Sequence, residues 1–168
     1  LLKLRPGAPT AVFAYAGSAH MVLPLTDDAK LVQTYVASLE TRIMPVPGKD
    51  TAKALQLVDA SLAGEDVPGT ILFLTDGIEP AAFDAFKKHA GNKEIMVLGV
   101  GTAEGGPIKT GEGTFLTDAT GGRVAARLDV GQLQALEREA GVRVATVPLD
   151  DSDVKWIAAR TLTHLEAR

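Results

Sequence analysis

The feature that most constrains the fold is a set of apolar segments with no polar alternation, separated by helical patterns. Residues 70–74 (TILFL) and 94–100 (EIMVLGV) are two such segments. Strands of this kind are buried on both faces, as in a parallel sheet that is covered by helices. Helical patterns begin near Pro80, between the two segments, and at Leu128, after them. This alternation predicts an α/β fold with a doubly wound, mostly parallel sheet and helices on both faces.

An antiparallel hairpin is predicted near the N-terminus. Residues 10–16 (TAVFAYA) and 19–23 (AHMVL) read as short apolar strands, and Gly17 and Ser18 lie between them. Glycine at the first of two loop positions favours a type II′ turn. The hairpin is therefore expected to form one edge of a Rossmann-like sheet.

Capping residues mark where the helices begin and end. Asp28, beside Asp27, precedes one helical pattern, and Asp50 precedes a second. Gly141 is expected to end the helix that starts after Leu128, and a last helix is expected to begin with a cap at residues 151–153. The side chains predicted to face the core are Leu31, Val32, Tyr35, Val36, Leu39, Leu55, Val58, Leu62, Phe83, Phe86, Leu133 and Leu136.

Composition limits the classes of function. The 168 residues are within the size of one domain, so we expect a single domain over residues 1–168. The net charge is −4 and the basic residues are scattered, so nucleic acid is not an expected partner. The sequence has no cysteine, which excludes disulfides and thiol catalysis. No apolar run reaches the ~18 residues of a membrane span, so this chain itself is not expected to insert into a membrane.

One acid stands at the end of a predicted buried strand. Asp76 follows the segment 70–74 after Thr75 and precedes Gly77. In open parallel sheets, ligands bind beyond the carboxyl ends of the strands. Asp76 is therefore a candidate metal ligand, or an acceptor that holds a metal-bound water. The alternative is an acid that caps the helix after it.

Other motifs carry weaker signals. Residues 99–106 (GVGTAEGG) resemble a dinucleotide-binding loop, but the sequence after them does not open a helix, so a structural loop is predicted. The three histidines do not have metal-binding spacing. Ser18 lies in the predicted turn without an evident base, so turn geometry explains it better than catalysis does.

Five segments, in order, resemble parts of a von Willebrand factor A domain, and more narrowly the bacterial aerotolerance (Bat) type. The resemblance covers nearly the whole chain, and its most specific parts are AGSAH with PLTDD, and GVGTAEGGPI. The five segments are FAYAGSAHMVLPLTDD (13–28), IMPVPGKD (43–50), ILFLTDG (71–77), VLGVGTAEGGPI (97–108) and RLDVGQLQALEREAG (127–141).

The resemblance implies a metal-ion-dependent adhesion site, usually for Mg²⁺, at the carboxyl end of the sheet. Its ligands are an Asp-x-Ser-x-Ser motif on the first strand, a Ser or Thr on a middle loop, and an Asp after a central strand, which Asp76 matches. At the middle loop this chain has Lys49, whose ammonium group cannot bind Mg²⁺ but can pair with Asp76 and occupy the place of the cation. Asp50 and Thr51 are possible substitute ligands. We therefore expect Mg²⁺ binding by this chain to be weak or absent, whereas the parent protein can still bind it.

The resemblance also implies that this chain lacks the first strand, which lies between the strands 10–16 and 70–74 in the family. The chain is thus expected to be N-terminally truncated. We weigh three outcomes: the two strands close up, another copy donates a strand, or the fold is only marginally stable. They stay open here.

By the same resemblance, the chain is a non-enzymatic protein-protein interaction module of a Bat-like, membrane-anchored bacterial protein. The implied partners are sibling A-domain proteins, tetratricopeptide-repeat (TPR) proteins and MoxR-type AAA+ ATPases. The implied location is the periplasm or cell envelope, with the cytoplasm left open. The alternatives are a small α/β hydrolase or phosphotransferase that uses Asp76, and a ligand-binding receptor domain.

Overall fold

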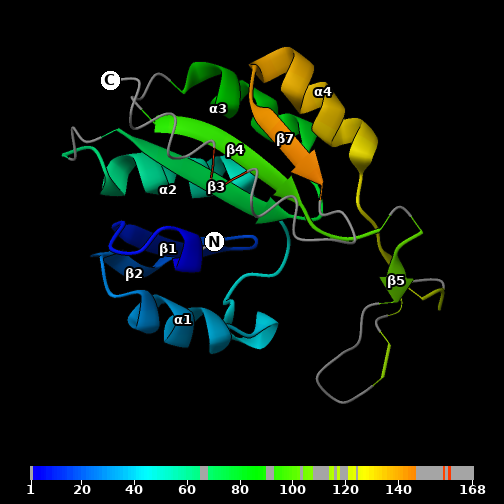
Figure 1. Ribbon diagram of the computed structural model, residues 1–168. Coiled ribbons are helices and arrows are strands. Elements are labelled where there is room, and N and C mark those ends of the chain that lie inside the picture. Colours follow the sequence, from blue (N-terminus) through cyan, green and yellow to red (C-terminus); the bar gives the residue numbers. More distant parts are fainter. Residues whose placement is uncertain are drawn as a thin grey trace.

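The centre of the molecule is a parallel sheet of three strands (Figure 1). The computed structural model describes residues 2–64, 68–89, 93–102, 104–107, 114, 115, 117, 121–123, 125–146, 157 and 159. β3 (Gly69–Thr75), β4 (Lys93–Gly99) and β7 (Arg143–Thr146) pair in the order β3, β4, β7. The middle strand, β4, has two parallel neighbours and is buried over residues 95–99. The parallel sheet predicted from the unbroken apolar segments is confirmed.

Helices cover one face of this sheet. They are α2 (Thr51–Ser61), α3 (Phe83–Lys88), which follows the short helix η3 (Pro80–Ala82), and α4 (Val130–Ala140) (Figure 1). Alternate side chains of β3 and β4 point toward them. The core between these helices and the sheet contains Leu55, Val58, Ile71, Phe73, Phe83, Phe86, Ile95, Val97, Leu133 and Leu136.

On the opposite face of the sheet, Ile157, a helical residue near the end of the chain, packs against the strands. Met96 and Leu98 point to this face and form a second buried cluster with Ile157. Ile157 is in helical conformation and is 3% exposed. The predicted arrangement, with helical residues on both faces of the sheet, is thus confirmed. The remainder of the predicted last helix, including its cap, lies outside the described residues.

The predicted antiparallel hairpin is present, but its turn differs from the prediction. β1 (Thr10–Tyr15) pairs with β2 (Ala19–Thr26). Residues 16–18 form a three-residue connection in which the N–H of Ala16 donates to the carbonyl of Ser18 at 2.8 Å. Gly17 does not have the positive φ that a type II′ turn requires. A Cβ atom on Gly17 would lie 2.3 Å from the carbonyl oxygen of Pro47, so glycine is needed here for close approach.

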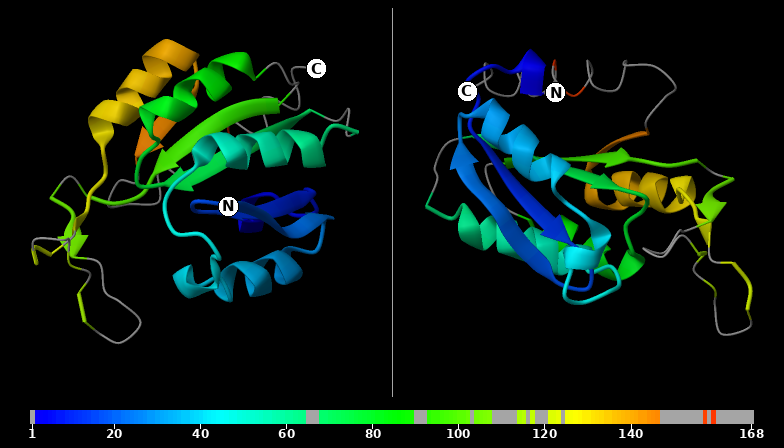
Figure 2. Two further views of the ribbon diagram at one scale, coloured as in Figure 1. Left: turned by 180° about the vertical axis from the view of Figure 1, so that it is seen from behind. Right: turned by 90° about the horizontal axis from the view of Figure 1, so that it is seen from below.

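The hairpin and the three-stranded sheet are separate sheets in the described part of the chain. β1 pairs only with β2, and β3 pairs only with β4. Figures 1 and 2 show β1 on the β3 side of the parallel sheet, with β2 beyond it. The two strands therefore do not close up into one sheet, which was one of the three outcomes considered from the sequence.

Helix α1 (Ala29–Ala37) buries less of its apolar face than predicted. Only Val32 is fully buried, at 2% exposed, whereas Leu31, Tyr35 and Val36 are between 38% and 49% exposed. The helix packs on a hairpin of only two strands, which is too narrow to cover the full apolar stripe (Figure 2).

The capping residues lie where the sequence placed them. The carboxylates of Asp28 and Asp50 accept backbone N–H groups at the starts of α1 and α2. Asp129, which the sequence analysis did not name as a cap, does the same at the start of α4. Gly141 ends α4 with a φ of 66°. These helix boundaries are local properties, so the sequence predicts them well.

The glycine-rich segment between β4 and α4 carries a small antiparallel ladder that projects from the body (Figure 1). It consists of β5 (Gly106–Pro107) and β6 (Ala125–Ala126). A single bridge joins Thr117 to Arg123, and the guanidinium of Arg123 lies 4.6 Å from the ring centroid of Phe115.

Two short 3₁₀ helices complete the described elements, η1 (Leu2–Leu4) before β1 and η2 (Thr41–Ile43) after α1. In the part of the chain that the structure describes, no helix combines the length and apolar character needed to cross a membrane.

Candidate functional site

Asp76 lies directly after β3, at the carboxyl end of the parallel sheet. The turn around it is fixed by Thr75, whose hydroxyl donates to the carbonyl of Gly77 at 2.6 Å and accepts the N–H of Gly77 at 3.3 Å. The carbonyl of Asp76 accepts the backbone N–H of Asp129 at 3.2 Å. The carboxylate is therefore presented by a turn that is held at both the strand and the start of α4.

The strand that carries this acid is an edge strand in the described sheet, whereas the resemblance implied a central one. β3 has β4 as its only partner. The expectation of a central strand is thus wrong for the described residues, because nothing there pairs with the second edge of β3.

Lys49 contacts Asp76 across the rim of the sheet. Its ammonium group donates to Oδ1 of Asp76 and, at 3.3 Å, to the carbonyl of Gly77. The two charged side chains are partly exposed, at 38% for Lys49 and 44% for Asp76. The ion pair predicted from the sequence is confirmed. It places a positive charge directly beside the predicted metal-ligating carboxylate.

Asp50 has its carboxylate directed to its own helix. Oδ1 accepts the N–H of Lys53 at 3.0 Å, and Oδ2 pairs with the Lys53 ammonium at 2.7 Å. These contacts lower the pKa of Asp50 below its ordinary value, the side-chain hydrogen bond from Lys53 being the largest cause and the backbone hydrogen bond the next. Asp50 thus acts as the N-cap of α2.

Thr51 is fully buried and is held by an acid from another loop. Its hydroxyl donates to Oε2 of Glu79 at 2.8 Å, and its backbone N–H donates to Oε1 at 2.5 Å. Glu79 lies three residues after Asp76, on the connection between β3 and α3. The sequence analysis missed Glu79, because a contact between residues 28 positions apart leaves no local pattern.

The three predicted ligands are therefore each engaged by a different partner. Asp76 pairs with Lys49, Asp50 with Lys53, and Thr51 with Glu79. Throughout the described residues, no group of three or more His, Cys, Asp or Glu side chains is placed to hold a metal. Mg²⁺ needs several oxygen ligands in near-octahedral geometry. The side-chain oxygen atoms of Asp76, Asp50 and Thr51, in this arrangement, do not fit a bound Mg²⁺ ion.

The carboxyl end of β1 reaches the same rim. The carbonyl of Ala16 accepts the backbone N–H of Asp50 at 2.7 Å, and the N–H of Gly17 donates to Val46 at 3.1 Å. The loop before α2 therefore contacts the ends of two strands. Asp50 binds Ala16, just after β1, and Lys49 binds Asp76, just after β3. Because both strands end at this loop, β1 and β3 run in the same direction.

Ser18 has a base beside it, contrary to the expectation from the sequence. Its Oγ lies 2.9 Å from Nε2 of His20, on the exposed hairpin. The signal was the i to i+2 spacing, which places the turn residue Ser18 beside His20 of β2. The described residues include no third group hydrogen-bonded to the imidazole, so the pair lacks the orienting partner of a catalytic triad.

Gly99, the last residue of β4 and the first of the glycine-rich segment, lies against the start of α4 and the residues before it. A Cβ atom on Gly99 would lie 2.7 Å from Cδ1 of Leu133 and 2.9 Å from Cδ1 of Leu128. Gly99 thus allows α4 to approach the sheet. Packing therefore accounts for glycine at this position.

Comparison with known proteins gives structural relatives only. No family model matches the chain, and no curated protein matches it. It is similar to the crystal structure of the conserved hypothetical protein BatB from Bacteroides thetaiotaomicron, with a TM-score of 0.88 and 25% identity over 98% of this chain and 83% of that one.

Two further solved structures have the same fold. An aerotolerance-related membrane protein from Bacteroides fragilis matches with a TM-score of 0.81 and 24% identity, over 99% of this chain and 85% of that one. A von Willebrand factor type A protein from Catenulispora acidiphila matches with a TM-score of 0.64 and 16% identity, over 98% of this chain and 35% of that one. The chain therefore has the fold of a von Willebrand factor A domain and is similar in structure to Bat-type proteins.

Proposed function

We propose that this domain is a non-enzymatic protein-protein interaction module that binds its partner at the rim formed by Lys49, Asp76 and Gly77. The observation that carries the proposal is the contact of the Lys49 ammonium with the Asp76 carboxylate. The ammonium group lies beside the carboxylate that the family motif assigns to a metal. The metal-ion-dependent adhesion site is then degenerate, with a fixed positive charge in place of the cation.

The chemistry of Lys49 supports a role in recognition. An ammonium group has three N–H donors. Two of them are directed to Asp76 and Gly77. The side chain is 38% exposed, so the remaining donor can reach an acceptor on a partner. A carboxylate or a backbone carbonyl of the partner fits this position, and binding needs no metal.

The partners proposed for this site are sibling A-domain proteins, TPR proteins and MoxR-type AAA+ ATPases, with the domain carried by a membrane-anchored protein of the cell envelope. One of the similar structures is described as an aerotolerance-related membrane protein, which supports this placement. The rim of this chain is the part of the site that each of these partner classes would contact.

The test is a binding assay with purified candidates of the three classes, in Mg²⁺ and in EDTA. We expect at least one class to bind with equal affinity in both buffers. Lys49→Gln should weaken that binding several-fold, whereas Lys30→Gln, which removes the same charge from exposed helix α1, should leave it unchanged. Failure of every class to bind, or loss of binding in EDTA, would contradict the proposal.

A separate titration tests the degenerate metal site. Isothermal titration of the chain with Mg²⁺ and Mn²⁺ should give no micromolar binding, because the predicted ligands are engaged by Lys49, Lys53 and Glu79. Micromolar affinity that is lost in Asp76→Asn would show that a cation displaces Lys49, and the site would then be a functional adhesion site.

The hydrolase alternative makes a different prediction. It requires turnover that depends on Asp76 or on the contact between Ser18 and His20. A panel of ester and phosphate substrates, compared between the wild type, Ser18→Ala and Asp76→Asn, separates the two hypotheses. We expect the three proteins to show the same background rate.

A further inference from the structure

His89 lies at the amino end of the parallel sheet, the opposite end from Asp76. It directly follows α3, and its side chain is 8% exposed. Nδ1 of its ring is 3.1 Å from Oδ2 of Asp59, in the last turn of α2. Nε2 is 3.1 Å from the carbonyl oxygen of Lys93, the first residue of β4. One imidazole ring thus joins the ends of α2 and α3 to the start of β4.

Both contacts of the ring can be hydrogen bonds only when it carries two protons. A neutral imidazole has one N–H donor and one acceptor nitrogen, whereas the imidazolium ion has two donors. An ionised carboxylate and a backbone carbonyl can only accept. The geometry at His89 therefore corresponds to the imidazolium ion, which donates to Asp59 and to Lys93 at the same time.

The position of Asp59 on its helix favours a positive charge on the ring. The C-terminus of a helix carries partial negative charge, so an acid in the last turn is unfavourable unless a cation lies beside it. The last turn of α2 contains no basic residue. The imidazolium ion of His89 supplies the positive charge that this helix end lacks.

A neutral ring must give up one of its two contacts. A hydrogen bond to a carboxylate is stronger than one to a neutral carbonyl, so the remaining proton stays on Nδ1, beside Asp59. Nε2 then directs its lone pair at the carbonyl oxygen of Lys93, and two acceptors at 3.1 Å repel each other. Loss of a proton from His89 therefore releases the start of β4, while the contact with α2 is retained.

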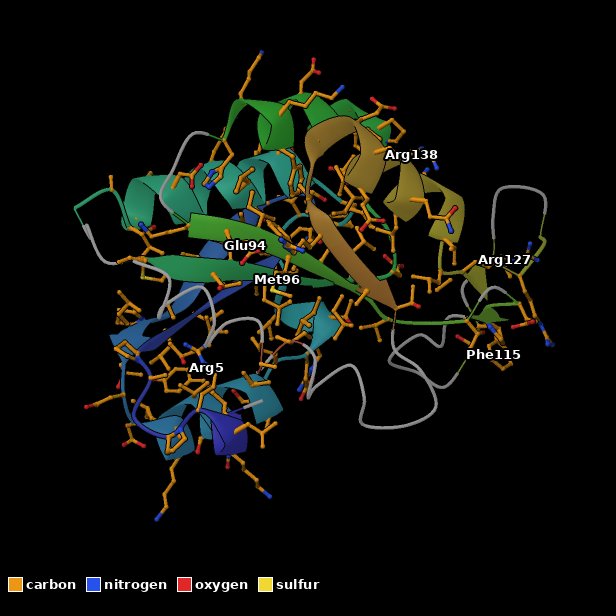
Figure 3. The ribbon with its side chains drawn as sticks, turned by 45° about the horizontal axis from the view of Figure 1, so that its top comes forward. Arg5, Glu94, Met96, Phe115, Arg127 and Arg138 are labelled. Carbon is orange, nitrogen blue, oxygen red and sulfur yellow. The ribbon has the colours of Figure 1, made fainter. Side chains whose placement is uncertain are left out.

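A hollow beside the ring gives water access to the released carbonyl. The hollow has a volume of about 210 Å³ and is lined by Phe86, His89, Ile95 and Val142, among others. Glu94, labelled at the start of β4 in Figure 3, also lines it and directly follows Lys93. A water molecule takes up about 30 Å³ in the liquid, so several can enter. Water in this hollow can bind the Lys93 carbonyl when the ring no longer does.

The other charged groups around the ring have partners of their own or point to solvent. Of the charged side chains that the structure describes here, only that of Asp59 contacts the imidazole. The part of α4 that lines the hollow is Ala140 and Gly141, which do not titrate. The remaining charged groups are Lys87, which pairs with Glu139 of α4, exposed Lys88, Lys93, whose ammonium donates to the carbonyl of Leu62, and Glu94, which pairs with Arg143 of β7.

We propose that His89 is a pH-sensitive link between the helices and the sheet. As the imidazolium ion it binds Asp59 and Lys93 together. As the neutral ring it keeps Asp59, releases Lys93 and opens the hollow between α3 and β4 to water. Histidine side chains change charge between about pH 5 and 8, so the start of β4 responds to pH in this range. The proposal is independent of the function proposed for the rim at Asp76.

The test is nuclear magnetic resonance of the full chain, labelled with ¹⁵N and ¹³C, from about pH 5 to about pH 8. The ring nitrogens of His89 report its protonation, and the carbonyl carbon of Lys93 reports the contact with β4. We expect both ring nitrogens to be protonated at the acid end. As the ring loses a proton, the Lys93 signal should shift in step with it, toward the position of a carbonyl without this hydrogen bond. His20, on the exposed hairpin, is the internal control, and its titration should leave the Lys93 signal unchanged.

Asp59→Asn tests which contact the neutral ring keeps. The amide group of asparagine can donate to Nδ1, so the neutral ring then carries its proton on Nε2 and stays bonded to Lys93. The Lys93 signal should therefore lose its dependence on pH in this variant. Asp84→Asn removes an exposed acid from α3 and is the matched control, in which the dependence should be the same as in the wild type.

Three outcomes would overturn the proposal. In the first, the ring of His89 carries one proton over the whole pH range. In the second, the ring loses a proton while the Lys93 signal of the wild type stays constant. In the third, the Lys93 signal shifts equally in the wild type and in Asp59→Asn, which would show that the signal follows the charge of the ring and not the loss of a hydrogen bond.

Discussion

The carboxylate of Glu79 holds Thr51 by two hydrogen bonds, one to the backbone N–H and one to the hydroxyl. Through this contact the loop after β3 caps the first turn of α2, although Asp50 is the local N-cap of that helix. The rim that carries Asp76 is therefore joined to α2 by Glu79 with Thr51, and to the loop before α2 by Asp76 with Lys49.

Removal of Glu79 should destabilise the protein. Thr51 is 0% exposed, so Glu79→Ala leaves a buried N–H and a buried hydroxyl without their partner. Such losses cost about 1–3 kcal/mol. Glu79→Gln keeps one side-chain oxygen as acceptor and should cost less. Urea unfolding measures both, with Glu104→Ala as an exposed control. Equal stability of the wild type and Glu79→Ala would contradict the role of this contact.

The pair of Lys49 and Asp76 should contribute little to stability. Both side chains are more than a third exposed, and exposed ion pairs contribute about 0–1 kcal/mol. A double-mutant cycle with Lys49→Gln and Asp76→Asn should give a coupling energy in this range that decreases with added salt. A coupling above about 2 kcal/mol would show that the pair is a structural element instead of a recognition site.

Gly17→Ala should separate the hairpin from the loop before α2. The new Cβ would lie 2.3 Å from the carbonyl oxygen of Pro47 and 2.7 Å from Cγ1 of Val46. Because a backbone atom cannot move away as a side-chain end can, we expect a loss of about 1–3 kcal/mol. Gly64→Ala is the control, since a Cβ there meets nothing within 4 Å. Thermal unfolding of both variants measures the loss. Equal melting temperatures of Gly17→Ala and Gly64→Ala would contradict this packing.

Asp50 should make stability depend on pH in the acid range. Its folded-state pKa is lowered, first by the side-chain hydrogen bond from Lys53. A lowered pKa gives a contribution that is complete above the unfolded-state pKa and is lost as the pH falls through the folded-state value. Asp50→Asn keeps an N-cap but not the charge. The difference in unfolding free energy between wild type and Asp50→Asn should therefore shrink as the pH is lowered below about 4. A difference that stays constant with pH would show that the charge of Asp50 has no effect.

The strands and caps were predictable because their signals are local. The unbroken apolar character of β3 and β4 predicted a sheet buried on both faces, and the acids Asp28 and Asp50 placed two helix starts. The position of Asp76 at the carboxyl end of β3 followed from the same pattern. Each of these features depends on a few consecutive residues, so the chain does not have to fold for them to be recognised.

Features that depend on distant neighbours were predicted poorly. The sequence did not show that Glu79 binds Thr51 or that His20 lies beside Ser18. The apolar face of α1 was predicted to be buried, but a two-stranded hairpin covers only the stripe around Val32. A hydrophobic pattern indicates which side chains can be buried. The width of the sheet that packs on the helix decides how many of these side chains are buried.

By itself, the sequence determined the order of strands and helices, the ends of the helices, and the acid at the rim. Only the tertiary structure decided that β1 and β3 do not pair with each other in the described residues, and that Thr51 and Asp50 are engaged by Glu79 and Lys53. The physical reason is the range of the interactions. Helix caps and strand patterns arise within one or two turns of chain, while edge pairing and ion pairs between loops exist only after folding brings distant residues together.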